Sequence, residues 1–86
     1  MAESKASVLR KMLQGDRLIQ AAGAYDGITA RLVEEAGFPA VYISGASVAG
    51  SRLGLPDMGF ISLPEIADVA RNIVHITSVP VICDID

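Results

Sequence analysis

The hydrophobic positions of this chain alternate between helical and strand-like spacing. Near the N-terminus, a helix is predicted that Ser4 or Ser7 can cap and Gly15 can end. Its apolar face consists of Val8, Leu9, Met12 and Leu13. Asp26 can cap a second helix, and Gly37 can supply the left-handed residue after it. The predicted buried side of this second helix consists of Ile28, Leu32, Val33 and Ala36.

A third helix has the clearest start signal in the chain. Ser62 and Glu65 have the spacing of a capping box, and Pro64 falls early in the first turn, where proline is tolerated. The apolar stripe of this helix consists of Ile66, Val69, Ala70 and Ile73.

Three strand-like segments separate these helices, at residues 18–24, 40–44 and 79–86. Helices and strands that alternate in this way are typical of a parallel sheet with right-handed crossovers. The triplets V-Y-I and V-I-C are apolar at every position, which indicates parallel strands covered on both faces. The fold class predicted from the pattern is therefore α/β.

One connection is longer than the others. Residues 45–61 join the second strand to the third helix, and they contain four glycines, one proline and one acid, Asp57. The prediction for this segment is a long loop. Loops of this length are uncommon in small domains and often carry function.

Composition narrows the choice of function. The chain has 86 residues, enough for one small domain, and 51% of them are hydrophobic. A net charge of −3 supplies no basic field for nucleic acid or for an anionic membrane. No segment has the length of a membrane span or the pattern of a signal peptide, and the single cysteine, Cys83, fits a reducing compartment. The expected location is the cytoplasm.

Polar side chains gather where the predicted strands end. Tyr25 and Asp26 follow the first strand, the segment S-G-A-S at 44–47 follows the second, and Asp84 and Asp86 end the third. In a parallel α/β sheet these positions share one rim, where ligands bind. Because Asp84 and Asp86 are two residues apart on a strand, both carboxylates point to one face and need a cation. Oxygen ligands suit Mg²⁺, with Mn²⁺ as an alternative.

Each of these residues also has an ordinary structural interpretation. The two acids could be a helix cap and a surface residue, and Asp57 follows Pro56 in what could be a simple turn. Cys83 alternates away from the acids and is expected in the core. His75 is expected to be solvated near the end of the third helix, where it complements the helix dipole.

Four motifs taken together are more specific than any one of them. They are Y-D-G-I-T-A-R-L-V-E-E-A-G-F at 25–38, V-Y-I-S-G-A-S-V at 41–48, L-G-L-P-D-M-G at 53–59 and V-I-C-D-I-D at 81–86. In this order they resemble the N-terminal portion of the isocitrate lyase and phosphoenolpyruvate mutase superfamily. The likeness is greatest to the smaller, methylisocitrate lyase-like members and extends over nearly the whole chain from Leu9 onward.

The resemblance implies a (β/α)8 barrel with an extra N-terminal helix, of which residues 1–86 would be the N-terminal part, truncated after strand three. It implies a Mg²⁺-dependent carbon–carbon lyase that acts on 2-methylisocitrate or a related 2-alkylmalate-type acid through a pyruvate-like enolate. The implied substrate-binding residues are Tyr42, Ser44, Gly45 and Ala46. The implied catalytic residue is Asp57, and the implied metal ligands are Asp84 and Asp86. The partner would be a small dicarboxylate or tricarboxylate, in a homo-oligomer, with a tetramer expected.

Several alternatives remain open at this point. Oxaloacetate decarboxylase or hydrolase and phosphonate mutase activities share the same motifs. A full barrel has about 250 residues, and the resemblance implies a catalytic cysteine on a later loop that Cys83 does not match. The 86-residue chain alone is therefore expected to be inactive. It could also be a non-catalytic product with a binding or assembly role, or a complete small α/β binding module.

Overall fold

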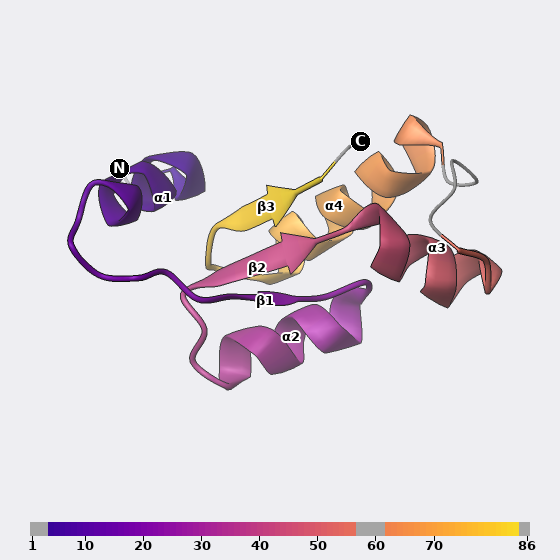
Figure 1. Ribbon diagram of the computed structural model, residues 1–86, viewed down its shortest axis with the longest axis horizontal. Helices are drawn as coiled ribbons and strands as arrows, with labels where there is room; N and C mark the ends of the chain where they lie inside the picture. Colours follow the sequence, from indigo (N-terminus) through magenta and orange to yellow (C-terminus); the bar gives the residue numbers. More distant parts are fainter. Residues whose placement is uncertain (1–3, 57–61, 85–86) are drawn as a thin grey trace.

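A computed structural model describes residues 4–56 and 62–84 of the chain (Figure 1). Within these ranges the chain forms a parallel sheet with helices. The elements in chain order are α1 (Lys5–Leu13), β1 (Ala21–Gly23), α2 (Gly27–Glu35), β2 (Ala40–Ile43), α3 (Gly45–Leu53), α4 (Leu63–Ile76) and β3 (Val81–Cys83). The predicted α/β class is confirmed. No helix in the described ranges is both long enough and apolar enough to cross a membrane.

The sheet has the strand order β1-β2-β3, with both neighbouring pairs parallel. Ala22 pairs with Val41, and Tyr42 pairs with Ile82, which places β2 at the centre. The strands are shorter than the sequence predicted. Leu18, which the pattern placed in the first strand, lies before β1 and is 88% exposed.

The hydrophobic core cluster lies on one side of the sheet, although Ala40, at the start of β2 on the other face, is also buried. On the central strand, Val41 and Ile43 are completely buried, and they belong to one cluster with Val33 of α2 and with Ile66 and Ile73 of α4. On the opposite face, Ala21, Gly23 and Ile82 are exposed and Tyr42 is half-buried. The prediction that the strands are covered on both faces is therefore wrong for the described residues. Throughout the article, "open face" means the face that carries these four residues.

The helix starts agree with the sequence signals. Ser4 caps α1 by accepting a hydrogen bond from the Ser7 amide at 3.1 Å. Asp26 caps α2 in a capping box, and Ser62 and Glu65 form the predicted capping box of α4. Gly37 follows α2 with a φ of 94°, a backbone conformation that favours glycine. Short polar side chains thus satisfy the first N–H groups of these helices.

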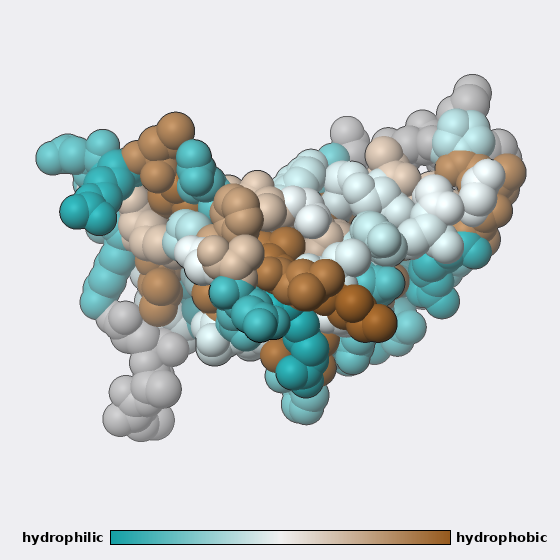
Figure 2. Space-filling view, turned by 90° about the horizontal axis from the view of Figure 1, so that it is seen from below, coloured by the Kyte–Doolittle hydropathy of each residue, from teal (hydrophilic) through white to brown (hydrophobic). Residues whose placement is uncertain are grey.

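The predicted buried side of α2 is partly wrong. Ala30 and Val33 are buried, but Ile28 is 73% exposed and Leu32 is 58% exposed, and Ala36 is also exposed. In Figure 2, which views the molecule from the side of α2, apolar side chains reach the surface over this region. The helix turns its small residue, Ala30, toward the sheet, which allows a close approach. Hydrophobic spacing alone could not distinguish this face from its neighbour.

The predicted loop at 45–61 contains a helix. Residues 45–53 form α3, which Ser44 caps and which ends at Gly54 in the left-handed conformation, with a φ of 66°. Glycine is a poor helix former, so Gly45 and Gly50 weaken the local signal. Val48 and Ala49 are completely buried, and their packing overrides the weak propensity. Residues 57–61 of the same connection, including Asp57, lie outside the described residues.

Two polar links tie the elements together at the amino ends of the strands. The ammonium group of Lys5 donates hydrogen bonds to the backbone carbonyls of Val74 and Thr77, at the C-terminal end of α4. Glu34 of α2 accepts hydrogen bonds from both the amide and the hydroxyl of Ser78, each at 2.6 Å. The hydroxyl and amide of Ser78, together with the positive charge of Lys5, hold the pKa of Glu34 below its usual range.

We predict that Glu34→Gln removes part of the acid sensitivity of folding. Because the folded-state pKa of Glu34 is lowered, its ionised form stabilises the protein above the ordinary glutamate pKa of about 4.3. This contribution is lost as the pH falls through the lowered pKa. Thermal unfolding measured from about pH 6 down to about pH 3 should therefore show a smaller drop in Tm for the variant. Glu35→Gln, at an exposed neighbouring position, is the matched control, and equal drops in both variants would contradict the prediction.

Candidate functional site

The candidate site lies at the carboxyl ends of β2 and β3. Asp84 follows β3, and its amide donates a hydrogen bond to the carbonyl of Ile43 at 2.9 Å, which extends the ladder by one step. The phenol of Tyr42 donates a hydrogen bond to Oδ2 of Asp84 at 3.4 Å. Because Tyr42 belongs to the open face, this bond places the Asp84 carboxylate over that face as well.

The environment of Tyr42 favours the neutral phenol. Partial burial raises its pKa, and the negative charge of Asp84 and the hydrogen bond to it raise the pKa further. Tyr42 therefore remains a hydrogen-bond donor at neutral pH, and it can orient an oxygen of Asp84 or of a bound ligand.

Cys83 points to the other side of the sheet. It packs against the hydrophobic core cluster, and burial, followed by the charge of Asp84, raises the pKa of its thiol. A raised pKa keeps the sulfur protonated and weakly nucleophilic. Cys83 is partly buried and lies at the edge of the core, so the prediction that it is a core thiol is confirmed only in part.

The N-terminus of α3 adjoins this rim. Oγ of Ser44 accepts a hydrogen bond from the amide of Ser47 at 3.2 Å, and the two hydroxyl groups are also 3.2 Å apart. Gly45 is buried, whereas Ala46 and Ser47 are exposed. The first N–H groups of a helix carry partial positive charge and favour a negatively charged ligand. The structure thus brings three of the predicted substrate residues, Ser44, Gly45 and Ala46, to the start of one helix.

The other sequence-predicted residues are placed differently. Asp86 and Asp57 lie outside the described residues, so Asp84 is the one predicted metal ligand that the structure locates. Asp26 lies at the rim, but its Oδ1 accepts hydrogen bonds from the amide of Thr29 at 2.9 Å and from its hydroxyl at 2.8 Å, which makes it a helix cap. Within residues 4–56 and 62–84, no three His, Cys, Asp or Glu side chains cluster closely enough to hold a metal ion.

Sequence reasoning missed α3, the helix that begins at the candidate carboxylate cradle, by which we mean Ser44, Gly45 and Ala46. The signal was present, because Ser44 and Ser47 have N-cap and N3 spacing and the buried pair Val48–Ala49 follows at once. The glycines of the segment suggested a loop instead.

Residues 9–86 match the family model for phosphoenolpyruvate phosphomutase. The chain belongs to this family. A 2-methylisocitrate lyase of Bacillus subtilis (strain 168) is 44% identical over 84 residues, which cover 98% of this chain and 28% of that enzyme. The resemblance of the four motifs to the superfamily is confirmed.

Solved structures of the family agree with the fold. An oxaloacetate acetylhydrolase in complex with the inhibitor 3,3-difluorooxalacetate superposes with a TM-score of 0.90 at 40% identity, over 96% of this chain and 29% of that one. A phosphonopyruvate hydrolase in complex with oxalate and Mg²⁺ gives a TM-score of 0.93 at 33% identity, over 98% of this chain and 29% of that one. The chain thus spans less than a third of the length of these relatives. It has the fold of the N-terminal helix and the first three βα-type units of the family's (β/α)8 barrel.

We predict that Ser44→Ala destabilises the protein by about 1 kcal/mol, because α3 loses the side chain that caps its N-terminus. The measurement is the free energy of unfolding in urea. Ser51→Ala, in the exposed second half of the same helix, is the matched control and should change stability much less. If the two variants had equal stability, the cap would not be important for folding.

Proposed function

We propose that this chain is the N-terminal part of a Mg²⁺-dependent carbon–carbon lyase that acts on 2-methylisocitrate or a related 2-alkylmalate-type acid. The observation that carries the proposal is the convergence of Tyr42, Asp84 and the N-terminus of α3 at one rim of the sheet, next to the open face. Residues of opposite electrostatic character therefore lie side by side. The N-terminus of α3 favours an anion, and the carboxylate of Asp84 favours a cation.

The N-terminus of α3 supports a role in binding a substrate carboxylate. Ser44, Gly45 and Ala46 would supply the hydroxyl and amide groups, and the helix dipole would add favourable charge. The hydroxyl of Ser44 accepts a hydrogen bond from the Ser47 amide and donates its own proton to the Ser47 hydroxyl, so a bound carboxylate would take over that proton from Ser47. Ala46 is exposed and carries only a small side chain, whereas Gly45 is buried beneath it. Tyr42 would line the substrate site beside this position, with its phenol proton donated to Asp84.

Asp84 fits a hard divalent cation. Its carboxylate is exposed at the open face, and oxygen donors of this kind suit Mg²⁺ or Mn²⁺. We infer that Asp84 and Asp86 hold the ion with substrate oxygens and water, and that Tyr42 orients Asp84. When bound, the ion would stabilise negative charge that develops on substrate oxygens as the carbon–carbon bond breaks. Asp57 would act beside the reacting carbons.

A second reaction class is supported by the comparisons. The structure of an oxaloacetate acetylhydrolase is 40% identical with a TM-score of 0.90, and that of a 2,3-dimethylmalate lyase is 40% identical with a TM-score of 0.88. We therefore keep hydrolysis of oxaloacetate, and reactions of phosphonopyruvate, as alternatives that use the same carboxylate cradle. The substrate common to all of them is a small dicarboxylate, tricarboxylate or phosphonate acid. We also propose a cytoplasmic homo-oligomer, with a tetramer expected.

The first test is an assay of the protein as its gene encodes it. With Mg²⁺ present, cleavage of 2-methylisocitrate or 2,3-dimethylmalate should release a 2-oxo acid, which can be followed by coupled reduction, and EDTA should abolish the reaction. Oxaloacetate and phosphonopyruvate are assayed in parallel. The 86-residue chain alone should be inactive, because its open face has no opposing strands to complete a barrel. A protein that turns over none of the four acids with Mg²⁺ would disprove the proposal.

We predict that Asp84→Ala abolishes the Mg²⁺-dependent activity and preserves the fold. The backbone amide of Asp84, and not its carboxylate, extends the sheet ladder, so the variant keeps that bond. Activity is measured at increasing Mg²⁺ concentration, and the fold is checked by circular dichroism. Asp68→Ala, an exposed position on α4, is the control for loss of one acid and should retain full activity. Unchanged activity of Asp84→Ala at saturating Mg²⁺ would exclude Asp84 from the metal site.

A further inference from the structure

The N–H groups at the start of α3 belong to the candidate carboxylate cradle, and their direction depends on the contacts that hold this helix in place. The buried residues of α3 are Gly45, Val48 and Ala49, all in its first half. Residues 50–56 are exposed, so the second half of the helix has little packing to fix it. A short helix that is anchored at one end only can tilt, and a tilt changes where its first N–H groups point.

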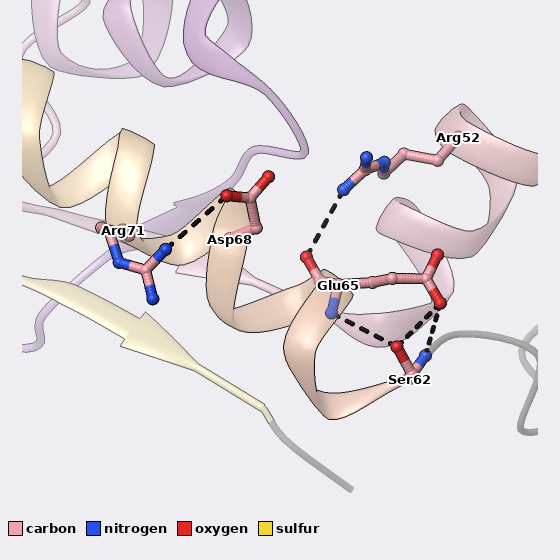
Figure 3. Close-up of polar contacts among 5 residues, drawn as sticks. All are labelled: Arg52, Ser62, Glu65, Asp68 and Arg71. Carbon is pink, nitrogen blue, oxygen red and sulfur yellow. Dashed lines mark hydrogen bonds and ion pairs between the residues drawn. The ribbon is translucent and has the colours of Figure 1, made fainter.

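One side chain links the exposed second half of α3 to another helix. Nη1 of Arg52, in the last turn of α3, donates a hydrogen bond to the backbone carbonyl of Glu65 at 3.4 Å (Figure 3). Within the described residues, this is the one side-chain hydrogen bond that joins α3 to another element. The hydrogen bonds from the hydroxyl and amide of Ser62 hold the pKa of Glu65 below its usual range, and the positive charge of Arg52 adds a smaller lowering.

A capping box holds the acceptor side of this contact. Oε1 of Glu65 accepts hydrogen bonds from the hydroxyl of Ser62 at 2.8 Å and from its amide at 3.1 Å, and the amide of Glu65 donates to Oγ of Ser62. This capping box fixes the first turn of α4. Ile66, the next residue, is buried in the core. Arg52 therefore attaches the loose half of α3 to a turn that is itself anchored on the sheet.

We propose that Arg52 is a positioning residue for the carboxylate cradle, acting through its contact with the first turn of α4. It holds the second half of α3 on α4 and so keeps the N–H groups at the start of α3 directed to the rim. This inference rests on the proposed function, because it gives Arg52 a role in a site that binds a carboxylate. Arg52 itself does not touch the substrate.

The chain offers a matched control on the same surface. Arg71 of α4 forms an exposed ion pair with Asp68 at 3.6 Å, also drawn in Figure 3, and both members belong to the same helix. Replacing Arg71 removes one positive charge without breaking a link between elements. A general effect of charge on anion binding would therefore appear in Arg71→Ala as well as in Arg52→Ala.

The test uses the protein as its gene encodes it, with oxalate as the probe and Mg²⁺ present. Calorimetry measures oxalate affinity, and amide hydrogen exchange is measured for peptides that cover 44–53. Loss of one hydrogen bond between elements should weaken oxalate binding by roughly 3- to 10-fold in Arg52→Ala. Exchange in the α3 peptides should become faster. Arg52→Lys, which keeps one donor and the charge, should recover part of the affinity, and Arg71→Ala should match the unaltered protein.

The outcomes separate this inference from the proposed function. Failure of the unaltered protein to bind oxalate would count against the carboxylate site itself. If it binds oxalate and Arg52→Ala equals Arg71→Ala in both affinity and exchange, the positioning role is wrong. If Arg52→Ala does not fold, Arg52→Lys and Arg52→Gln replace it, and full affinity in Arg52→Gln would overturn the inference. Faster exchange with unchanged affinity would also overturn it, because α3 would move without affecting the cradle.

Discussion

The arrangement of the candidate site depends on the burial of the central strand, β2, against the helices on one side of the sheet. Val41 and Ile43 of β2 are completely inaccessible, and helices α2 and α4 pack over them. Because side chains alternate along a strand, this burial also decides that Tyr42 must face the other way. A slip of one residue in the register would bury the phenol and expose the two aliphatic residues. The hydrophobic effect thus fixes the orientation of the polar residues at the site.

The site combines a helix N-terminus with a carboxylate on the neighbouring strand. Helix α3 starts directly after β2, and Asp84 follows β3, so the parallel ladder brings the two together. Neither element would place its groups here in an antiparallel sheet, where the ends of neighbouring strands lie on opposite edges. The links made by Lys5 and Glu34 are found at the other ends of the strands. Contacts that hold the helices together and groups suited to chemistry are therefore separated along the strand axis.

Local signals in the sequence were sufficient for the parts of the fold that depend on neighbouring residues. The caps at Asp26 and Ser62 and the left-handed Gly37 are short-range features, and the structure has all three. The face of α2 and the helix at 45–53 depend on tertiary packing. The predicted buried side of α2 was right for Val33 and wrong for Ile28 and Leu32, and a loop was predicted where α3 forms. Ile28 is exposed because α2 turns Ala30 and Val33 to the core instead, and α3 buries Val48 and Ala49, with Val48 part of the core cluster. The shared rim was predicted from the parallel topology. The contact of Arg52 was not predicted, because the backbone carbonyl of Glu65 that it binds comes close to it only in the folded structure.

The strand order also has a consequence for how this region folds. Each strand pairs with the next one along the chain, so that Ala21 meets Ala40 and Val41 meets Val81. Each pairing closes over one helical segment or two, and no strand has to be inserted between two that are already paired. Each pairing has to wait until its parallel crossover has closed, and non-local pairings of this kind are slow steps in folding. Each new strand is nevertheless added at an edge of the sheet. The sheet can therefore grow by adding one strand at a time, in the order in which a ribosome would deliver them.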